Sequence, residues 1–242
     1  ANTIIDIVTN NTALTQTVNY KVTPTLVAGN CVGAAKTVSV SVDPAPIVTS
    51  TNDITICGGN MVNISFTSNI PSTYSWLASD NINTTGESLI SQSGNTLNDV
   101  IDNNSGSLQV VSYTVSPTSI SGGCLGSSQI VNVSVNPAPV MTSTNALTVC
   151  TGVSFNISLT SDINSTYKWI GLDNINTSGE TLTQQNSNNI NNTIVNGTAA
   201  SQTVTYSVTP TSTSSSCVGV SQLIAVTVDP APFMTSANSG TI

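Results

Sequence analysis

Val42-Asp43-Pro44-Ala45-Pro46 returns twice further along the chain, as Val135-Asn136-Pro137-Ala138-Pro139 and as Val228-Asp229-Pro230-Ala231-Pro232. The spacing is constant, because the first prolines of neighbouring copies are 137 − 44 = 93 and 230 − 137 = 93 residues apart. A fixed period over two intervals predicts tandem copies of one folded module, joined by the Pro-Ala-Pro stretch.

The period predicts two complete modules and two partial ones in the 242 residues. We expect complete modules at 47–139 and 140–232, the C-terminal half of a module at 1–46, and the first strand of the next module at 233–242. With partial copies at both ends, and neither an initiator Met nor a signal peptide, we expect a window on a longer protein.

The charge of the chain argues against several classes of function. It has no histidine, three lysines and no arginine, and a net charge of −8. Nucleic-acid binding needs clustered Lys and Arg, whereas Lys21, Lys36 and Lys168 are scattered singly. No apolar run approaches the ~20 residues that span a bilayer, and there is no basic amphipathic helix, so we expect no membrane insertion in this segment.

Alternating apolar residues predict β-strands throughout. Val62, Ile64 and Phe66 share one face of a strand, and Phe155, Ile157 and Leu159 repeat that face one period later. We expect two short, irregular strands between Asp80 and Ser107, and we expect Pro117 to end or kink the strand before it. The large aromatic residues expected in the core are Trp76, Tyr113, Trp169 and Tyr206.

About seven short strands per ~90 residues, with an inward Trp on the third, is the pattern of an immunoglobulin-like sandwich. The fold class predicted is therefore all-β, with tandem immunoglobulin-like β-sandwich modules in a linear rod. The short proline linkers, ~4 residues at ~3.1 Å each, leave little room for free rotation and favour a stiff array.

The motifs of the middle module resemble those of PKD-like modules of large Bacteroidota surface proteins. The residues that carry the resemblance are Ile54-Thr55-Ile56-Cys57-Gly58-Gly59, Thr73-Tyr74-Ser75-Trp76, Tyr113-Thr114-Val115-Ser116-Pro117 and Gly123-Cys124-Leu125-Gly126. The chain departs from the standard pattern after the Trp, where Leu77-Ala78-Ser79-Asp80 replaces an acidic, glycine-rich signature. The resemblance implies long cell-surface or secreted chains, including giant adhesins of gliding bacteria exported by the type IX secretion system, in which such units act as spacers and stalks.

The five cysteines occupy only two positions of the repeat. Cys57 and Cys150 end the first strand of a module, while Cys31, Cys124 and Cys217 lie in the loop before the last strand. Such regular spacing predicts a disulfide framework and an oxidising, exported compartment. Zinc is not indicated, because the chain has neither histidines nor the paired cysteine spacing of a zinc site.

The connectivity of these cysteines has three alternatives. Bonds within modules would pair Cys57 with Cys124 and Cys150 with Cys217. In a Greek-key sandwich, however, these positions lie at opposite ends of a strand of ~8 residues at ~3.3 Å each, beyond disulfide reach. A bond across the module boundary, between Cys57 and Cys217, avoids this problem and is favoured, and free thiols are the third alternative.

Two polar loops hold oxygen atoms at the same repeat positions. The weak calcium candidates are Asp80, Asn83, Glu87, Asp173, Asn176 and Glu180. Calcium usually takes 6 to 8 oxygens with several carboxylates, so two acidic residues per loop favour a capped polar loop over a cation site. We expect no cofactor.

The chain shows no sign of an enzyme. It has no histidine for a catalytic triad and no repeated pair of carboxylates beside an apolar pocket. The function predicted is a stiff spacer or fibre shaft in an extracellular adhesin or surface filament. The expected partners are neighbouring modules, other copies in a filament, or surface polysaccharide bound elsewhere in the protein. The alternatives are carbohydrate-binding modules and a filament subunit that assembles by strand complementation.

Overall fold

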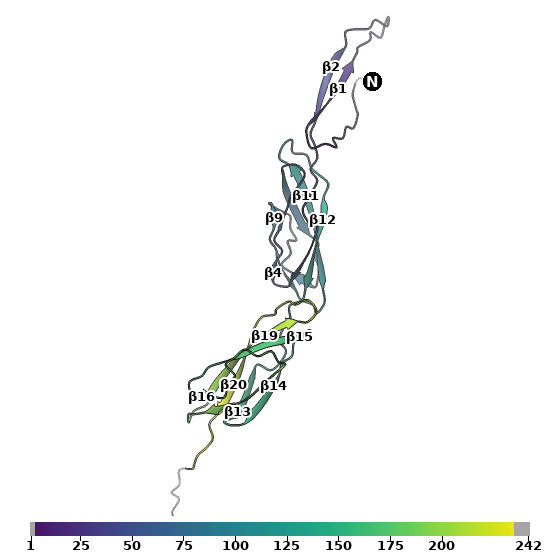
Figure 1. The fold of residues 1–242 in the computed structure, drawn as a ribbon. Coiled ribbons are helices and arrows are strands. Elements are labelled where there is room, and N and C mark those ends of the chain that lie inside the picture. The colour runs from purple at the N-terminus through teal and green to yellow at the C-terminus, as the bar shows by residue number, and fades with distance from the viewer. Residues whose placement is uncertain (1–2, 235–242) are drawn as a thin grey trace, which may run out of the picture. The chain divides into compact units, whose positions relative to one another are not determined.

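The computed structural model describes residues 3–234. The regular secondary structure in this part of the chain consists of β-strands (Figure 1). Contacts divide these residues into two compact units. The first contains the described residues up to Ile56, together with Asn60–Ile101 and Gln109–Val135. The second contains Cys57–Gly59, Asp102–Leu108 and the described residues from Asn136 onwards. No described helix is long and apolar enough to cross a membrane.

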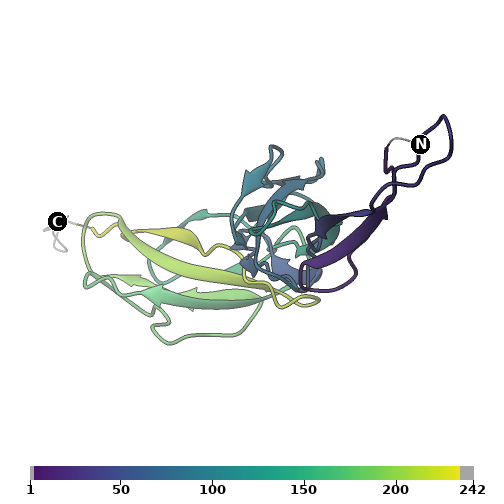
Figure 2. The ribbon, with the colours of Figure 1, turned by 90° about the horizontal axis from the view of Figure 1, so that it is seen from above.

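The first partial repeat forms an antiparallel hairpin, coloured purple in Figure 2. Its strands are β1 (Gln16–Val22) and β2 (Lys36–Val42), and Tyr20 lies opposite Val38. One face carries valines that stay accessible, since Val38 is 41% and Val40 39% exposed. The equivalent strands of the complete repeats bury these positions.

The middle repeat consists of two layers of strands. A five-stranded sheet has the order β3-β12-β11-β6-β8, and a three-stranded and a two-stranded sheet (β4-β10-β7 and β5-β9) supply the second layer. The bounds are β3 (Asp53–Cys57), β4 (Asn60–Met61), β5 (Ile64–Ser65), β6 (Ser72–Ala78), β7 (Thr84–Thr85), β8 (Gln92–Ser93), β9 (Thr96–Leu97), β10 (Val100–Asn103), β11 (Gln109–Ser119) and β12 (Gln129–Asn136).

The last repeat has the same two layers. Its main sheet is four-stranded, in the order β13-β20-β19-β15, and the pairs β14-β17 and β16-β18 form the other layer. The first strand pairs in parallel with the last, and the other neighbours are antiparallel. The bounds are β13 (Ala146–Cys150), β14 (Ser154–Ser158), β15 (Ser165–Leu172), β16 (Thr177–Ser178), β17 (Asn189–Thr193), β18 (Val195–Asn196), β19 (Gln202–Ser212) and β20 (Gln222–Asp229).

Each complete repeat has its own hydrophobic core between its layers, and the predicted aromatic residues lie in these cores. The exposed fractions are 7% for Trp76, 0% for Tyr113, 4% for Trp169 and 0% for Tyr206. Trp169 packs edge-on against Tyr206, with ring centroids 5.8 Å apart. The alternation of apolar and polar residues along the long strands therefore matches the burial, and the predicted all-β sandwich is confirmed.

Three local expectations need correction. The region after strand β6 contains four short strands, β7 to β10, in place of two. The second strand of the middle repeat is broken into β4 and β5, because Asn63 adopts a left-handed φ of 52°. The third expectation was that Pro117 ends or kinks its strand, and the ending is wrong, since β11 continues through Pro117 to Ser119.

Pro117 fits inside β11 because its missing N–H has no partner to lose. The pairing of β11 with β12 ends at Val115 opposite Gln129, while Pro117 stays in register with Tyr74 on the other side. The Pro117 carbonyl still accepts from Gly126 N–H at 2.9 Å. A proline is tolerated where the neighbouring ladder is interrupted, and here the regular pairing breaks after Val115 and resumes as an isolated bridge between Thr118 and Leu125.

A tyrosine in each core hydrogen-bonds to one polar side chain, which is half-buried at Asp99 and buried at Asn192. Tyr113 donates its hydroxyl to Asp99 Oδ2 at 2.7 Å, and the same carboxylate accepts from Ser88 N–H and Oγ. In the last repeat the Tyr206 hydroxyl donates to the amide oxygen of Asn192 at 2.7 Å. The same oxygen accepts from Thr181 N–H. An acid and its amide thus fill the same position, because both supply the acceptor that a buried hydroxyl needs.

We predict that stability falls at alkaline pH through these tyrosines. Burial raises the pKa of Tyr206 to about 12, and burial together with Asp99 raises the pKa of Tyr113. A group whose pKa is raised by folding contributes its stability fully below its unfolded pKa of about 10, and loses it as the pH rises through the folded value. Between pH 9 and pH 12, the free energy of unfolding in urea should fall by about 2 kcal/mol less for Tyr206→Phe than for the parent. An unchanged pH dependence in this variant would contradict the assignment.

Candidate functional site

The features that recur in register lie at the ends of the repeats. We call Leu26–Cys31, Ser119–Cys124 and Ser212–Cys217 the cysteine loops. Cys57–Gly59 and Cys150–Gly152 are the strand-A turns. The three Pro-Ala-Pro stretches are the proline linkers.

The cysteine loops share two backbone features. The N–H of the first residue donates to the carbonyl of the cysteine at 2.9, 2.9 and 2.8 Å in the three loops. The residue before each cysteine is left-handed, with φ of 53° at Asn30, 64° at Gly123 and 61° at Ser216. These two features are present at Cys217 and at the two free cysteines alike, but the loops differ one residue earlier, where Gly29 and Gly122 are left-handed and Ser215 is not.

The strand-A turns are also alike. Gly59 and Gly152 are left-handed, with φ of 82° and 77°. Gly58 N–H donates to Asn136 O at 2.8 Å, and Thr151 N–H donates to Asp229 O at 2.9 Å. Each turn therefore holds its cysteine at the end of the strand that pairs with the last strand of the repeat.

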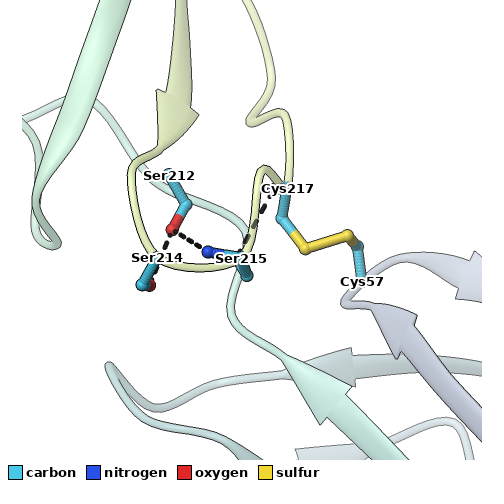
Figure 3. Close-up of a disulfide and its surroundings, with 5 residues drawn as sticks. All are labelled: Cys57, Ser212, Ser214, Ser215 and Cys217. Carbon is cyan, nitrogen blue, oxygen red and sulfur yellow. Dashed lines mark hydrogen bonds between the residues drawn. A yellow bond between two sulfur atoms is a disulfide. The ribbon is translucent and has the colours of Figure 1, made fainter.

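The structure contains a disulfide between Cys57 and Cys217, with the Cα atoms 5.6 Å apart (Figure 3). Cys217 is 1% exposed. Around it, Ser212 Oγ accepts from Ser215 N–H at 3.4 Å and lies 3.2 Å from Ser214 Oγ. The bond crosses the boundary between two repeats of the sequence, as the strand topology favoured.

The pairs within repeats are not formed. Cys124 and Cys150 are free thiols in the structure, as is Cys31. The two exposed thiols are Cys31 and Cys150, while Cys124 is half-buried. All three occupy a repeat position that is bonded in the Cys57–Cys217 pair.

Two of the proline linkers are built into the repeat that follows them. Pro46 and Pro139 are buried, and their carbonyl oxygens lie against Gly126 and Gly219, which stand between the cysteine loop and the strand that follows it. A Cβ on Gly126 would stand 2.0 Å from Pro46 O, and a Cβ on Gly219 would stand 1.9 Å from Pro139 O. Only glycine leaves room for this contact.

The residue after each linker is tied down as well. Val140 N–H donates to Asp162 Oδ1 at 2.8 Å, and Asp162 N–H returns a bond to Val140 O at 3.0 Å. Ile47 and Asn69 make the same reciprocal pair at 2.7 and 3.1 Å. The linker is therefore an ordered element of the following repeat, with its backbone groups satisfied by that repeat.

A family model of the PKD-like domain matches residues 1–46, 54–139 and 147–232. The chain belongs to the PKD-like domain family. No curated protein matches it. Among solved structures, a chimeric titin Z1Z2 protein is similar at 13% identity over 78% of this chain and 98% of that one, with a TM-score of 0.26. An I-band fragment of titin is similar at 8% identity over 91% and 89%, with a TM-score of 0.33.

The PKD-like repeats share an asparagine that the sequence analysis did not single out. Asn10, Asn103 and Asn196 each donate their side-chain amide to a carbonyl four residues later, at 2.9, 2.8 and 2.8 Å. Asn196 also reaches Val228 O at 2.9 Å. These residues clamp the loop beside the strand-A turn. Their recurrence every 93 residues was the available signal, hidden by the abundance of Asn in the chain.

The predicted calcium loops are closed by their own hydrogen bonds. Glu87 accepts from Thr84 Oγ1 at 2.8 Å, and Glu180 accepts from Thr177 Oγ1 at 2.6 Å. The amides of Asn83 and Asn176 donate to Gln109 and Gln202, at 3.3 and 3.2 Å. The remaining candidates, Asp80 and Asp173, are exposed. Among residues 3–234 no three His, Cys, Asp or Glu side chains gather as a metal site would require.

The aromatic residues of strand β6, which a carbohydrate-binding module could use for stacking on a sugar, do not reach the surface. Tyr74 and Trp76 are 6% and 7% exposed, and both pack against Phe66 with ring centroids 5.4 Å away. A sugar stacks on the open face of a ring, so these residues serve the core.

We predict that Gly219→Ala disturbs the linker while Gly33→Ala does not. A Cβ at either position meets the Cγ of the preceding proline at 3.0 Å, but only the Cβ at Gly219 also meets a linker carbonyl. Gly219→Ala should cost about 1–3 kcal/mol more than Gly33→Ala, as overpacking does. Urea unfolding followed by Trp fluorescence and hydrogen exchange at Val140 N–H measure this. Equal exchange in the two variants would contradict the linker contact.

We also predict that calcium leaves the protein unchanged. The loop carboxylates already accept hydrogen bonds, and two acidic residues per loop fall short of the usual calcium ligand set. Calorimetric titration with CaCl₂ should show no binding heat, and the melting temperature should not move. Binding heat would contradict this prediction. The cation would then be expected at the buried Glu87 Oε2, which accepts no hydrogen bond in the structure, and Glu87→Gln should abolish the heat.

Proposed function

We propose that this chain is a structural segment of a long extracellular adhesin or surface filament, in which PKD-like repeats act as a stiff spacer. The observation that carries the proposal is the junction itself. The proline linker, with Pro139 buried, packs as part of the last repeat. The disulfide joins Cys57 to Cys217 of the same repeat. A chain that only needed flexible tethering would have no use for either.

The two connections act in different ways. The proline linker fixes backbone dihedrals and has its carbonyl packed against Gly219, so it resists bending at one point. The disulfide connects residues 160 positions apart in sequence. Two separate attachments restrict rotation more than one, because a single covalent connection leaves a free torsion axis.

The disulfide and the family support an extracellular location. Structural disulfides persist in oxidising compartments and are rare in reducing cytosol. The surface is also nearly free of charged groups, since only 6% of residues are charged, which suits contact between neutral chains. An origin in Bacteroidota adhesins of gliding cells and export by the type IX system extend the proposal, on the strength of the sequence motifs alone.

We predict that removing the disulfide makes the chain more flexible. Cys57→Ser combined with Cys217→Ser leaves one connection at the junction. Small-angle scattering should then show a broader distribution of dimensions than the parent. Cys150→Ser is the matched control, because Cys150 occupies the same repeat position without a bond within the chain, and its removal should leave the scattering of the monomer unchanged.

The spacer role would be contradicted by identical scattering of the double variant and the parent. It would also be contradicted by saturable binding of the parent chain to a glycan array, which would favour a carbohydrate-binding module. Force spectroscopy on the oxidised and reduced parent gives a second measurement. The disulfide should shorten the length released on unfolding, because the residues between the two cysteines cannot extend.

A further inference from the structure

We propose that the strand-A turn of the last repeat, with the surface around it, is a docking site for the cysteine loop of another PKD-like repeat, and that Cys150 forms a disulfide with that loop. This inference does not depend on the spacer role. It follows from comparing two equivalent surfaces, one covered and one open.

The covered surface belongs to the middle repeat. Its strand-A turn, Cys57–Gly59, and its loop Asp102–Leu108 form one compact unit with the last repeat. A Cβ on Gly106 would stand 3.5 Å from Ile163 Cγ2, which is ordinary packing distance. The Cys57–Cys217 disulfide joins the turn to the cysteine loop of that repeat.

In the part of the chain that the structure describes, no repeat covers the equivalent surface of the last repeat. Thr151, Asn196–Ala199 and Pro230–Phe233 line a hollow of about 740 Å³. Pro232 is exposed, whereas Pro46 and Pro139, at the same linker position, are buried. Phe233 is 77% exposed. The groups that a neighbouring repeat covers elsewhere are therefore accessible here, including the Cys150 thiol.

The open surface already has the shape of the covered one. Its turn has the same left-handed glycine and the same bond to the last strand, as described above. Asn196 N–H donates to Thr151 Oγ1 at 2.8 Å, and the Asn196 amide holds Ala200 O and Val228 O. A rigid, preformed surface binds without the entropic cost of ordering.

The occupant is identified by the bonded pair. In the Cys57–Cys217 bond a strand-A turn pairs with a cysteine loop, and the two unbonded cysteine loops share with the bonded one its closing hydrogen bond and the left-handed residue before the cysteine. The Cys31 loop is fully exposed and carries no charged side chain between Leu26 and Cys31. In a solution of this chain alone, the partner of Cys150 is therefore Cys31 of a second copy. In the protein at large it is the cysteine loop of any further repeat.

Bond formation needs an oxidant of the disulfide class. The two thiols, one on each copy, lose two electrons and two protons as the new S–S bond forms. A small disulfide such as oxidised glutathione accepts the electrons and protons, and leaves as two thiols after exchange through a mixed disulfide.

The test uses the full chain in a glutathione redox buffer, followed by non-reducing electrophoresis and peptide mapping. We expect disulfide-linked multimers in which peptides joining Cys150 to a cysteine loop, Cys31 or Cys124, outnumber Cys150–Cys150 and Cys31–Cys31 peptides. Cys150→Ser should stay monomeric and keep its Cys57–Cys217 bond. Random collision of thiols would already yield each mixed pair about twice as often as each self-pair, so only a larger excess supports docking, and a ratio near two would overturn the proposal.

A second pair of variants separates docking from thiol reactivity. Gly197→Arg fills the hollow without changing any cysteine, and Gly197 has no left-handed φ that would disfavour a side chain. Leu223→Arg places the same charge on an exposed position of β20. The first should slow cross-linking about tenfold, equivalent to ~1.4 kcal/mol of docking free energy, and the second should not. Equal rates for both variants would show that the surface takes no part.

Discussion

The contact between a linker carbonyl and a glycine with no room for a Cβ sets the arrangement of both complete repeats. Pro46 O meets Gly126, and Pro139 O meets Gly219. With the carbonyl held there, the next residue falls into reach of Asn69 or Asp162, and the first strand enters beside the last. The proline linker is therefore the first structural element of each repeat. The Pro-Ala-Pro stretch, which in the sequence only marks the repeat boundary, is thus part of the folded repeat.

The repeats preserve positions more strictly than they preserve chemistry. The acceptor for the core tyrosine is an acid in one repeat and an amide in the next, because the buried hydroxyl needs only a lone pair. The indole of Trp169 donates to Ser187 at 3.0 Å, whereas Gly94 stands at that position in the middle repeat and Trp76 Nε1 has no partner. Such differences change the stability of a repeat without changing its ends.

Much of this could be predicted because it depends on period and parity. The 93-residue spacing, the inward faces of Val62 and Phe66, and the separation of the two cysteine positions all follow from local pattern and general topology. The strand through Pro117 could not, since its tolerance depends on where a neighbouring strand stops. Nor could the role of Gly126, because a turn glycine and a contact glycine look alike in sequence. The calcium loops looked ambiguous for a similar reason: an oxygen that binds a cation and one that caps a turn are the same residue until their partners are known.

The parallel pairing of β13 with β20 has a consequence for a chain under tension. Ala146 lies beside Ala225 and Cys150 beside Asp229, so the strand that enters the repeat and the strand that leaves it run in the same direction. Pulling on the two ends of the repeat slides these strands along each other. The hydrogen bonds of a parallel ladder are evenly spaced, so sliding loads them together and does not peel them apart singly. A force applied to the two ends of the repeat therefore acts on this strand pair in shear. In that geometry several hydrogen bonds must break at once.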